Sequence, residues 1–201
     1  MAAMTKERFE TGLTYDQYKE GMSRNRDRVE ANEQNVSLDP EAVRAFRSLP
    51  RPLNVVVLAE DWCGDVIANL PVLGRLAREV GTLSVRVFYR DQNDDLMERW
   101  LNQGKFKSIP VFAFFDEHFK ELGHWIERPA SVSELRARKR REIFERSPEF
   151  GSPDAPIDQL PEDVRARLQG EIAKMRDDTT AFANAEVLRE LRELVATQPV
   201  R

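Results

Sequence analysis

The sequence predicts an α/β fold, a mixed sheet flanked by helices, with extra N- and C-terminal helices. Residues 53–59 form a nearly continuous apolar run, which is typical of a strand buried on both faces. A helical pattern follows over residues 63–80 and a second strand pattern over 83–89. Because a helix connects these two strands, we expect them to be parallel. Strand patterns at 110–115 and 120–125, with a turn between them, predict an antiparallel hairpin.

Two helix starts precede the first strand. Thr14 with Gln17 three residues later is a capping-box pair and predicts one helix over residues 14–30. Asp39 is a favourable N-cap and Pro40 suits the first helical position, which predicts a second helix that ends near Leu49.

The helix after the first strand has one apolar face, and Gly81 is expected to end it. Pro71 lies within it and should kink it. A shorter helix is expected over residues 94–102, with Gly104 beyond its end.

The C-terminal part of the chain predicts further helices. Ser131 or Ser133 is expected to cap a helix with a basic side. The proline-rich stretch 147–161 predicts a linker, and residues 161–196 predict one broken helix or two consecutive helices.

We therefore expect three regions. Residues 1–37 should form an N-terminal helical extension, residues 38–146 the α/β domain, and residues 147–201 a linker and a C-terminal helical segment.

The charge and the distribution of apolar residues argue against nucleic acids and membranes as partners. The net charge of −4 argues against general nucleic-acid binding, and no stretch approaches the roughly 20 apolar residues that span a bilayer. The two histidines and the single cysteine lack the spacing of metal ligands, so we expect no metal site. A lone cysteine also agrees with a reducing compartment, and we expect a cytoplasmic protein without membrane partners.

The single cysteine, Cys63, follows the first strand within Asp61-Trp62-Cys63-Gly64-Asp65-Val66. A sulfur at a helix N-terminus is close to free N–H groups and to the positive end of the helix dipole, which lower a thiol pKa. The carboxylates of Glu60, Asp61 and Asp65 act in the opposite direction. We expect an accessible thiolate of low pKa.

These motifs resemble the thioredoxin-like superfamily, and within it bacterial thioredoxin family proteins whose motif is Trp-Cys-Gly-Asp-Cys. The resemblance lies in Trp62-Cys63-Gly64-Asp65 at a strand-to-helix junction, Pro71 eight residues after the cysteine, and Ser108-Ile109-Pro110 before the third strand. It implies that Cys63 is the nucleophile and that Pro110 is a cis-proline facing the sulfur. It also implies a substrate groove that is formed by Trp62, Gly64, Asp65, Val66, Ile109, Pro110, Gly123 and His124.

Two departures from the family pattern bear on function. Val66 occupies the position of the resolving cysteine, and Val57 that of a buried aspartate. The resemblance then implies a monothiol protein that forms a mixed disulfide through Cys63. Its partner would be a protein disulfide or a glutathionylated protein. Its co-substrate would be glutathione or another low-molecular-weight thiol, and it would need no other cofactor.

Other classes of function remain open. The chain could be a redox-inactive binding or adaptor module that kept the groove and lost turnover. The terminal helices would then form a partner or homodimer surface. A third reading is an intermolecular disulfide between two Cys63 residues, which Trp62 should hinder.

Overall fold

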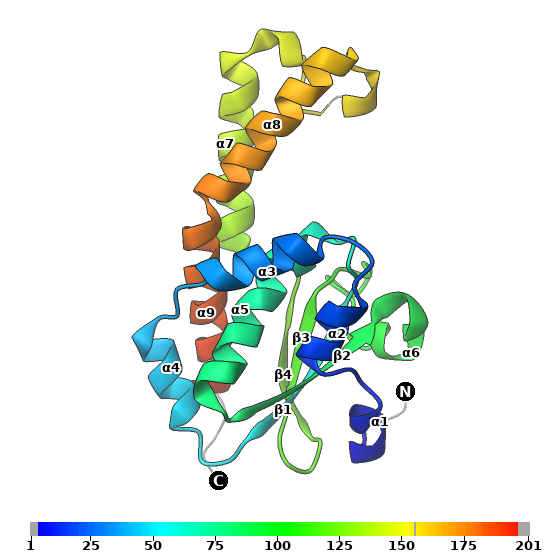
Figure 1. Cartoon of the computed structure of the whole chain (residues 1–201), viewed down its shortest axis with the longest axis vertical. Helices are drawn as coiled ribbons and strands as arrows, with labels where there is room; N and C mark the ends of the chain where they lie inside the picture. The colour runs from blue at the N-terminus through cyan, green and yellow to red at the C-terminus, as the bar shows by residue number, and fades with distance from the viewer. Residues whose placement is uncertain (1–3, 155, 197–201) are drawn as a thin grey trace. The chain divides into compact units, whose positions relative to one another are not determined.

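The computed structural model describes residues 4–154 and 156–196. Their sheet has the strand order β2-β1-β3-β4 (Figure 1). The central strand β1 (Leu53–Ala59) pairs in parallel with β2 (Leu83–Tyr89) and antiparallel with β3 (Val111–Phe115). Strand β4 (Glu121–Ile126) pairs antiparallel with β3. The predicted mixed sheet, its parallel pair and its hairpin are confirmed.

The chain forms two compact units. One unit ends at Arg128 and resumes at Val187, and the other is Pro129–Glu186. The expected division after residues 37 and 146 stays a prediction. The second unit is inserted in sequence between β4 and the last turns of the C-terminal helix.

Between residue 4 and β1 the structure has four helices: α1 (Lys6–Glu10), α2 (Tyr15–Gly21), α3 (Arg26–Asn35) and α4 (Pro40–Arg47). Thr14 and Gln17 form the predicted capping box at α2, and Asp39 caps α4 as predicted.

The prediction of a single helix over residues 14–30 is wrong, because α2 ends at Gly21 and α3 begins only at Arg26. Asn25 has a positive φ of 58°, and the carboxylate of Asp61 accepts hydrogen bonds from the backbone N–H groups of Ser23 and Arg24. A distant side chain therefore stabilises a turn where local sequence favours helix.

Helix α5 (Gly64–Val80) begins after Cys63 and ends at Gly81, whose φ is 70°. Pro71 lies inside it. In Figure 1, α3 and α5 lie side by side.

The predicted helix over residues 94–102 is too long. After a 3-10 turn (Arg90–Gln92), α6 covers only Asp94–Met97. The chain then turns, which places buried Trp100 edge-on against Phe115 with its indole N–H on Glu121 at 2.9 Å.

Apolar side chains fill both faces of the sheet. Phe112 and Trp125 stack with ring centroids 4.9 Å apart on one face, and Phe115 packs with Trp100 on the other. The last turns of α9 (Thr180–Ala196) pack against the Phe112 face, where Glu190 accepts a hydrogen bond from the Trp125 indole at 2.7 Å. The apolar residues that α9 adds to this core are Val187, Leu188, Leu191 and Val195.

The inserted unit contains α7 (Ala130–Arg146) and α8 (Glu162–Asp178), with 3-10 turns at Pro148–Phe150 and Ile157–Gln159. The two consecutive helices predicted after residue 161 are confirmed as α8 and α9. The predicted serine cap is wrong, since Pro129 occupies the N-cap position of α7 without a side-chain hydrogen bond.

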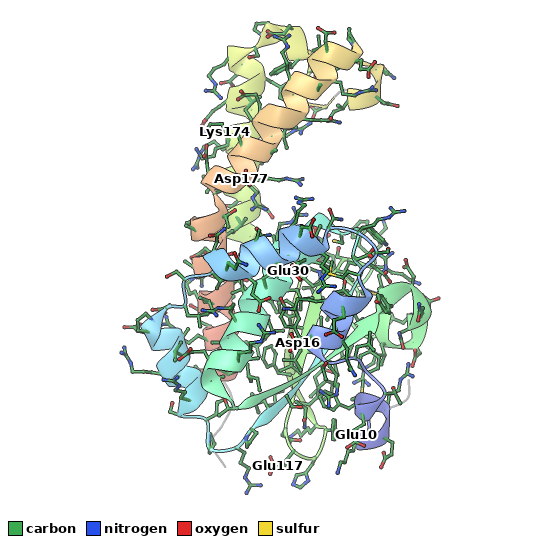
Figure 2. All side chains as sticks on the ribbon, in the orientation of Figure 1. Glu10, Asp16, Glu30, Glu117, Lys174 and Asp177 are labelled. Carbon is green, nitrogen blue, oxygen red and sulfur yellow. The ribbon has the colours of Figure 1, made fainter. Side chains whose placement is uncertain are left out.

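The inserted unit has its own small core. It is formed by Ile143, Phe144, Phe150, Leu168 and Met175. Phe150, Ile157 and Leu160 of the predicted linker pack in or against this core. Lys174 and Asp177 are exposed on α8 (Figure 2). Within the described residues, no helix is long and apolar enough to cross a membrane.

Candidate functional site

Cys63 lies at the junction between β1 and α5 and is the N-cap of that helix. Its Sγ is 3.5 Å from the carbonyl oxygen of Ile109, and the Ile109–Pro110 peptide bond is cis. The sulfur is half-buried. The structure therefore brings Cys63, Gly64, Ile109 and Pro110 to one place.

The expected low pKa of Cys63 is wrong. Burial raises the pKa of the Cys63 thiol above its ordinary value, and the charge of Asp65 raises it further. Hydrogen bonds from the backbone N–H groups of Val66 and Asp65 and the charge of Arg90 lower the pKa, but they do not outweigh burial.

A charged cluster lies beside the start of α5. The Arg128 guanidinium is 3.2 Å from the carboxylate of Asp65 and also pairs with the carboxylate of Glu127. Burial alone would lower the pKa of Arg128, but these two carboxylates and the proximity of Cys63 raise it. Arg128 and Glu127 are not among the residues predicted for the site.

Glu127 is firmly held at the end of β4. Its φ is 66°, its N–H donates to the carbonyl of Pro110 at 2.8 Å, and its own carbonyl accepts from Asn69 of α5 at 2.8 Å. The Asn102 side-chain amide donates to the Glu127 carboxylate at 2.9 Å. Arg128 therefore directly follows a residue whose backbone is hydrogen-bonded to both α5 and Pro110.

Trp62 and Arg90 lie on another side of the site. Trp62 is 46% exposed, and the Arg90 guanidinium is 4.9 Å from its ring centroid. Arg90 also donates to the carbonyl of Lys107, next to Phe106, which is 50% exposed. Trp62 is therefore partly open to solvent, with Arg90 over its ring.

Two carboxylates just before Cys63 are held by the protein. The buried Glu60 accepts the N–H of Asp91 at 2.8 Å, and burial raises its pKa. The Asp61 carboxylate accepts hydrogen bonds from Ser23 and Arg24. Burial alone would raise the pKa of Asp61, but these bonds lower it.

The positions that would assist a dithiol cycle are apolar. Val66 and Val57 are both fully buried. No group of three or more His, Cys, Asp or Glu side chains suited to a metal is present in the described residues.

Gly123 and His124, predicted as groove residues, lie farther along the sheet. Gly123 is opposite Phe114 and faces Leu194 of α9, while His124 is opposite Ala113 with its ring 2.9 Å from Glu121. The strand residue opposite Val111, which directly follows Pro110, is Ile126. The segment that reaches Pro110 is therefore Glu127-Arg128.

A family model described as "Thioredoxin" matches residues 12–140. The chain belongs to the thioredoxin family. Its thioredoxin fold is also seen in two solved structures, although identities of 17–18% show the fold alone. An HIV epitope-scaffold is 18% identical with a TM-score of 0.65, over 98% of this chain and 100% of that one. A protein of unknown function from Pseudomonas aeruginosa is 17% identical with a TM-score of 0.62, over 98% of each chain. No curated protein matches the sequence.

One of the missed residues of this thioredoxin-family site had a signal in the sequence. Arg90 directly follows β2, and the ends of two parallel strands meet at the same edge of a sheet, so Arg90 could have been placed near Cys63. Arg128 had no such signal, because its position depends on where β4 ends.

Proposed function

We propose that this thioredoxin-family protein carries out thiol–disulfide exchange as a monothiol, through Cys63, in the cytoplasm. The observation that supports the proposal most is the placement of the sulfur. Cys63 Sγ lies at the first turn of α5, 3.5 Å from the carbonyl oxygen of Ile109 and half-exposed to an incoming disulfide. Such a site exposes one reactive sulfur beside a peptide backbone.

The substrate we propose is a glutathionylated protein or a protein disulfide. The Cys63 thiolate attacks one sulfur of the substrate disulfide; a new S–S bond forms as the old one breaks, and the second sulfur leaves as a thiolate that takes a proton from solvent. Because Val66 has no thiol, a thiolate of glutathione or a similar small thiol then attacks the mixed disulfide and releases Cys63. For a glutathionylated protein, Cys63 takes the glutathione and one external thiolate removes it as a small-molecule disulfide, so that two electrons reach the substrate. A protein disulfide needs a second external thiol to complete its reduction.

The raised pKa of Cys63 defines how this exchange depends on pH. Only the thiolate attacks, and burial raises the pKa of the Cys63 thiol from which it forms. An unperturbed cysteine has a pKa of about 8.5. Because the pKa of Cys63 is higher, the rate of exchange should keep increasing above that pH.

A redox-inactive binding module is the second candidate. Three features favour this candidate because each reduces turnover. They are the buried side chains of Val66 and Val57 and the raised pKa of Cys63. The helices that flank the fold would then supply the surface for a partner or for a second copy of the chain.

One experiment separates the two candidates. The protein is incubated with oxidised glutathione between pH 6.5 and 9.5, and its intact mass is measured before and after excess thiol, with Cys63→Ser as the control. We expect a glutathione adduct that forms faster at higher pH and is removed by thiol. Absence of the adduct at every pH would favour the binding module, in which Cys63→Ser retains partner binding.

A further inference from the structure

Arg128 is the basic side chain that the structure holds between the start of α5 and the end of β4. Its guanidinium pairs with Asp65, two residues after Cys63, and with Glu127. The Glu127 backbone and carboxylate are fixed in turn by Pro110, Asn69 and Asn102. The guanidinium is thus held by two carboxylates of the protein itself.

The pair with Asp65 matters because that carboxylate is the negative charge that most disfavours the Cys63 thiolate. An unpaired carboxylate this close to the sulfur would hold the proton on the thiol. A guanidinium beside it offsets that charge, and the interaction with Cys63 contributes in turn to the raised pKa of Arg128. Arg90, whose guanidinium lies over the Trp62 ring, also favours the thiolate.

We propose that Arg128 is a positioning residue of this site, whose guanidinium offsets the charge of Asp65 and thereby favours the Cys63 thiolate. Arg128 acts through Asp65 and the local field and takes no part in bond making. The inference deepens the proposed function, since it concerns the same sulfur, but its readout is the acidity of the thiol and requires no exchange activity.

The test measures the rate of iodoacetamide alkylation of Cys63 against pH, from which the thiol pKa is obtained. An opposite charge within about 4–6 Å lowers a pKa by about 1–3 units. Arg128 is 32% exposed and shared by two carboxylates, so we expect Arg128→Gln to raise the pKa by about half a unit. Below the pKa, that shift slows alkylation about threefold. Arg128→Lys keeps the charge and should stay closer to wild type.

Two further variants test the coupling. Asp65→Asn should lower the pKa of Cys63, because the carboxylate that raises it is gone while Arg128, still paired with Glu127, remains. The double variant Arg128→Gln/Asp65→Asn should return toward the wild-type value, since both charges are absent. The matched control is Arg192→Gln, because Arg192 is 31% exposed and also pairs with two carboxylates, Asp39 and Glu41. It should leave the pKa unchanged.

The direction of the change separates a charge effect from a loss of structure. If Arg128→Gln only loosened the end of β4, the sulfur would become more exposed and its pKa would fall, because burial is what raises it. A fall, or no change, with Arg128→Gln overturns the inference, as does an equal rise with Arg192→Gln. If the shifts appear as expected but no glutathione adduct forms, the proposed function fails and the role of Arg128 stands.

Discussion

Replacement of Asp61 by asparagine should destabilise the fold by removing the charge that holds the turn between α2 and α3. One oxygen of Asp61 accepts the N–H of Ser23 at 2.8 Å, the hydroxyl of Ser23 at 2.8 Å and the N–H of Arg24 at 3.0 Å. A hydrogen bond to a charged group contributes about 1.5–3 kcal/mol, and these bonds are exposed to solvent. The neutral amide can still accept, so we expect a loss of about 1–2 kcal/mol for the whole group.

The loss should depend on pH. The folded-state pKa of Asp61 is below its ordinary value. Its ionised form therefore stabilises the fold above the unfolded pKa of about 3.9, and this contribution is lost as pH falls through the folded pKa. The difference between wild type and Asp61→Asn should be full at pH 7 and shrink in more acid solution.

Urea unfolding followed by circular dichroism measures both effects. Asp27→Asn, at an exposed position on α3, is the control and should change stability by less than about 0.5 kcal/mol. The reasoning is refuted if Asp61→Asn equals wild type at pH 7, or if its deficit is the same at pH 7 and pH 3.

Two further predictions concern redox chemistry and packing. Val66→Cys should give partial activity in an insulin-reduction assay with dithiothreitol, because it supplies a second thiol at the first turn of α5; a wild-type protein of equal activity would contradict the monothiol proposal. Gly74→Ala should lower the midpoint of thermal unfolding, because its Cβ would lie 2.4 Å from a carbon of the Tyr15 ring, at a cost of about 1–3 kcal/mol. Gly170→Ala, on α8 with no atom within 4 Å of the new Cβ, should instead stabilise by about 0.5–1 kcal/mol, and equal losses from both variants would disprove the packing argument.

Local patterns predicted those elements whose stability is local. The apolar strand β1, the capping box of Thr14 and the stop at Gly81 all depend on neighbours in the sequence, and each was placed correctly. The break after Gly21 depends on Asp61, 38 residues away from Ser23. The sequence of residues 14–30 alone therefore cannot predict this break.

The same limit applies to the candidate site. Cys63 and Pro110 were found because the motifs around them are short and contiguous. The pKa of Cys63 was predicted in the wrong direction, because burial by distant residues cannot be read from Glu60, Asp61 and Asp65. The family resemblance implies a groove position for Gly123, but the resemblance does not contain the register of β4 against β3. That register puts Gly123 opposite Phe114 and brings Arg128 beside Asp65.

The late position of α9 in the chain affects how the protein is made. A ribosome synthesises all four strands, and then the whole insertion, before it reaches Val187–Val195. Until then the Phe112–Trp125 face lacks its apolar cover, and the Trp125 indole lacks Glu190. A nascent chain in this state exposes an apolar surface for the time needed to translate the insertion. Such a surface favours chaperone binding or aggregation. A stop codon just before residue 187 would leave that surface exposed permanently.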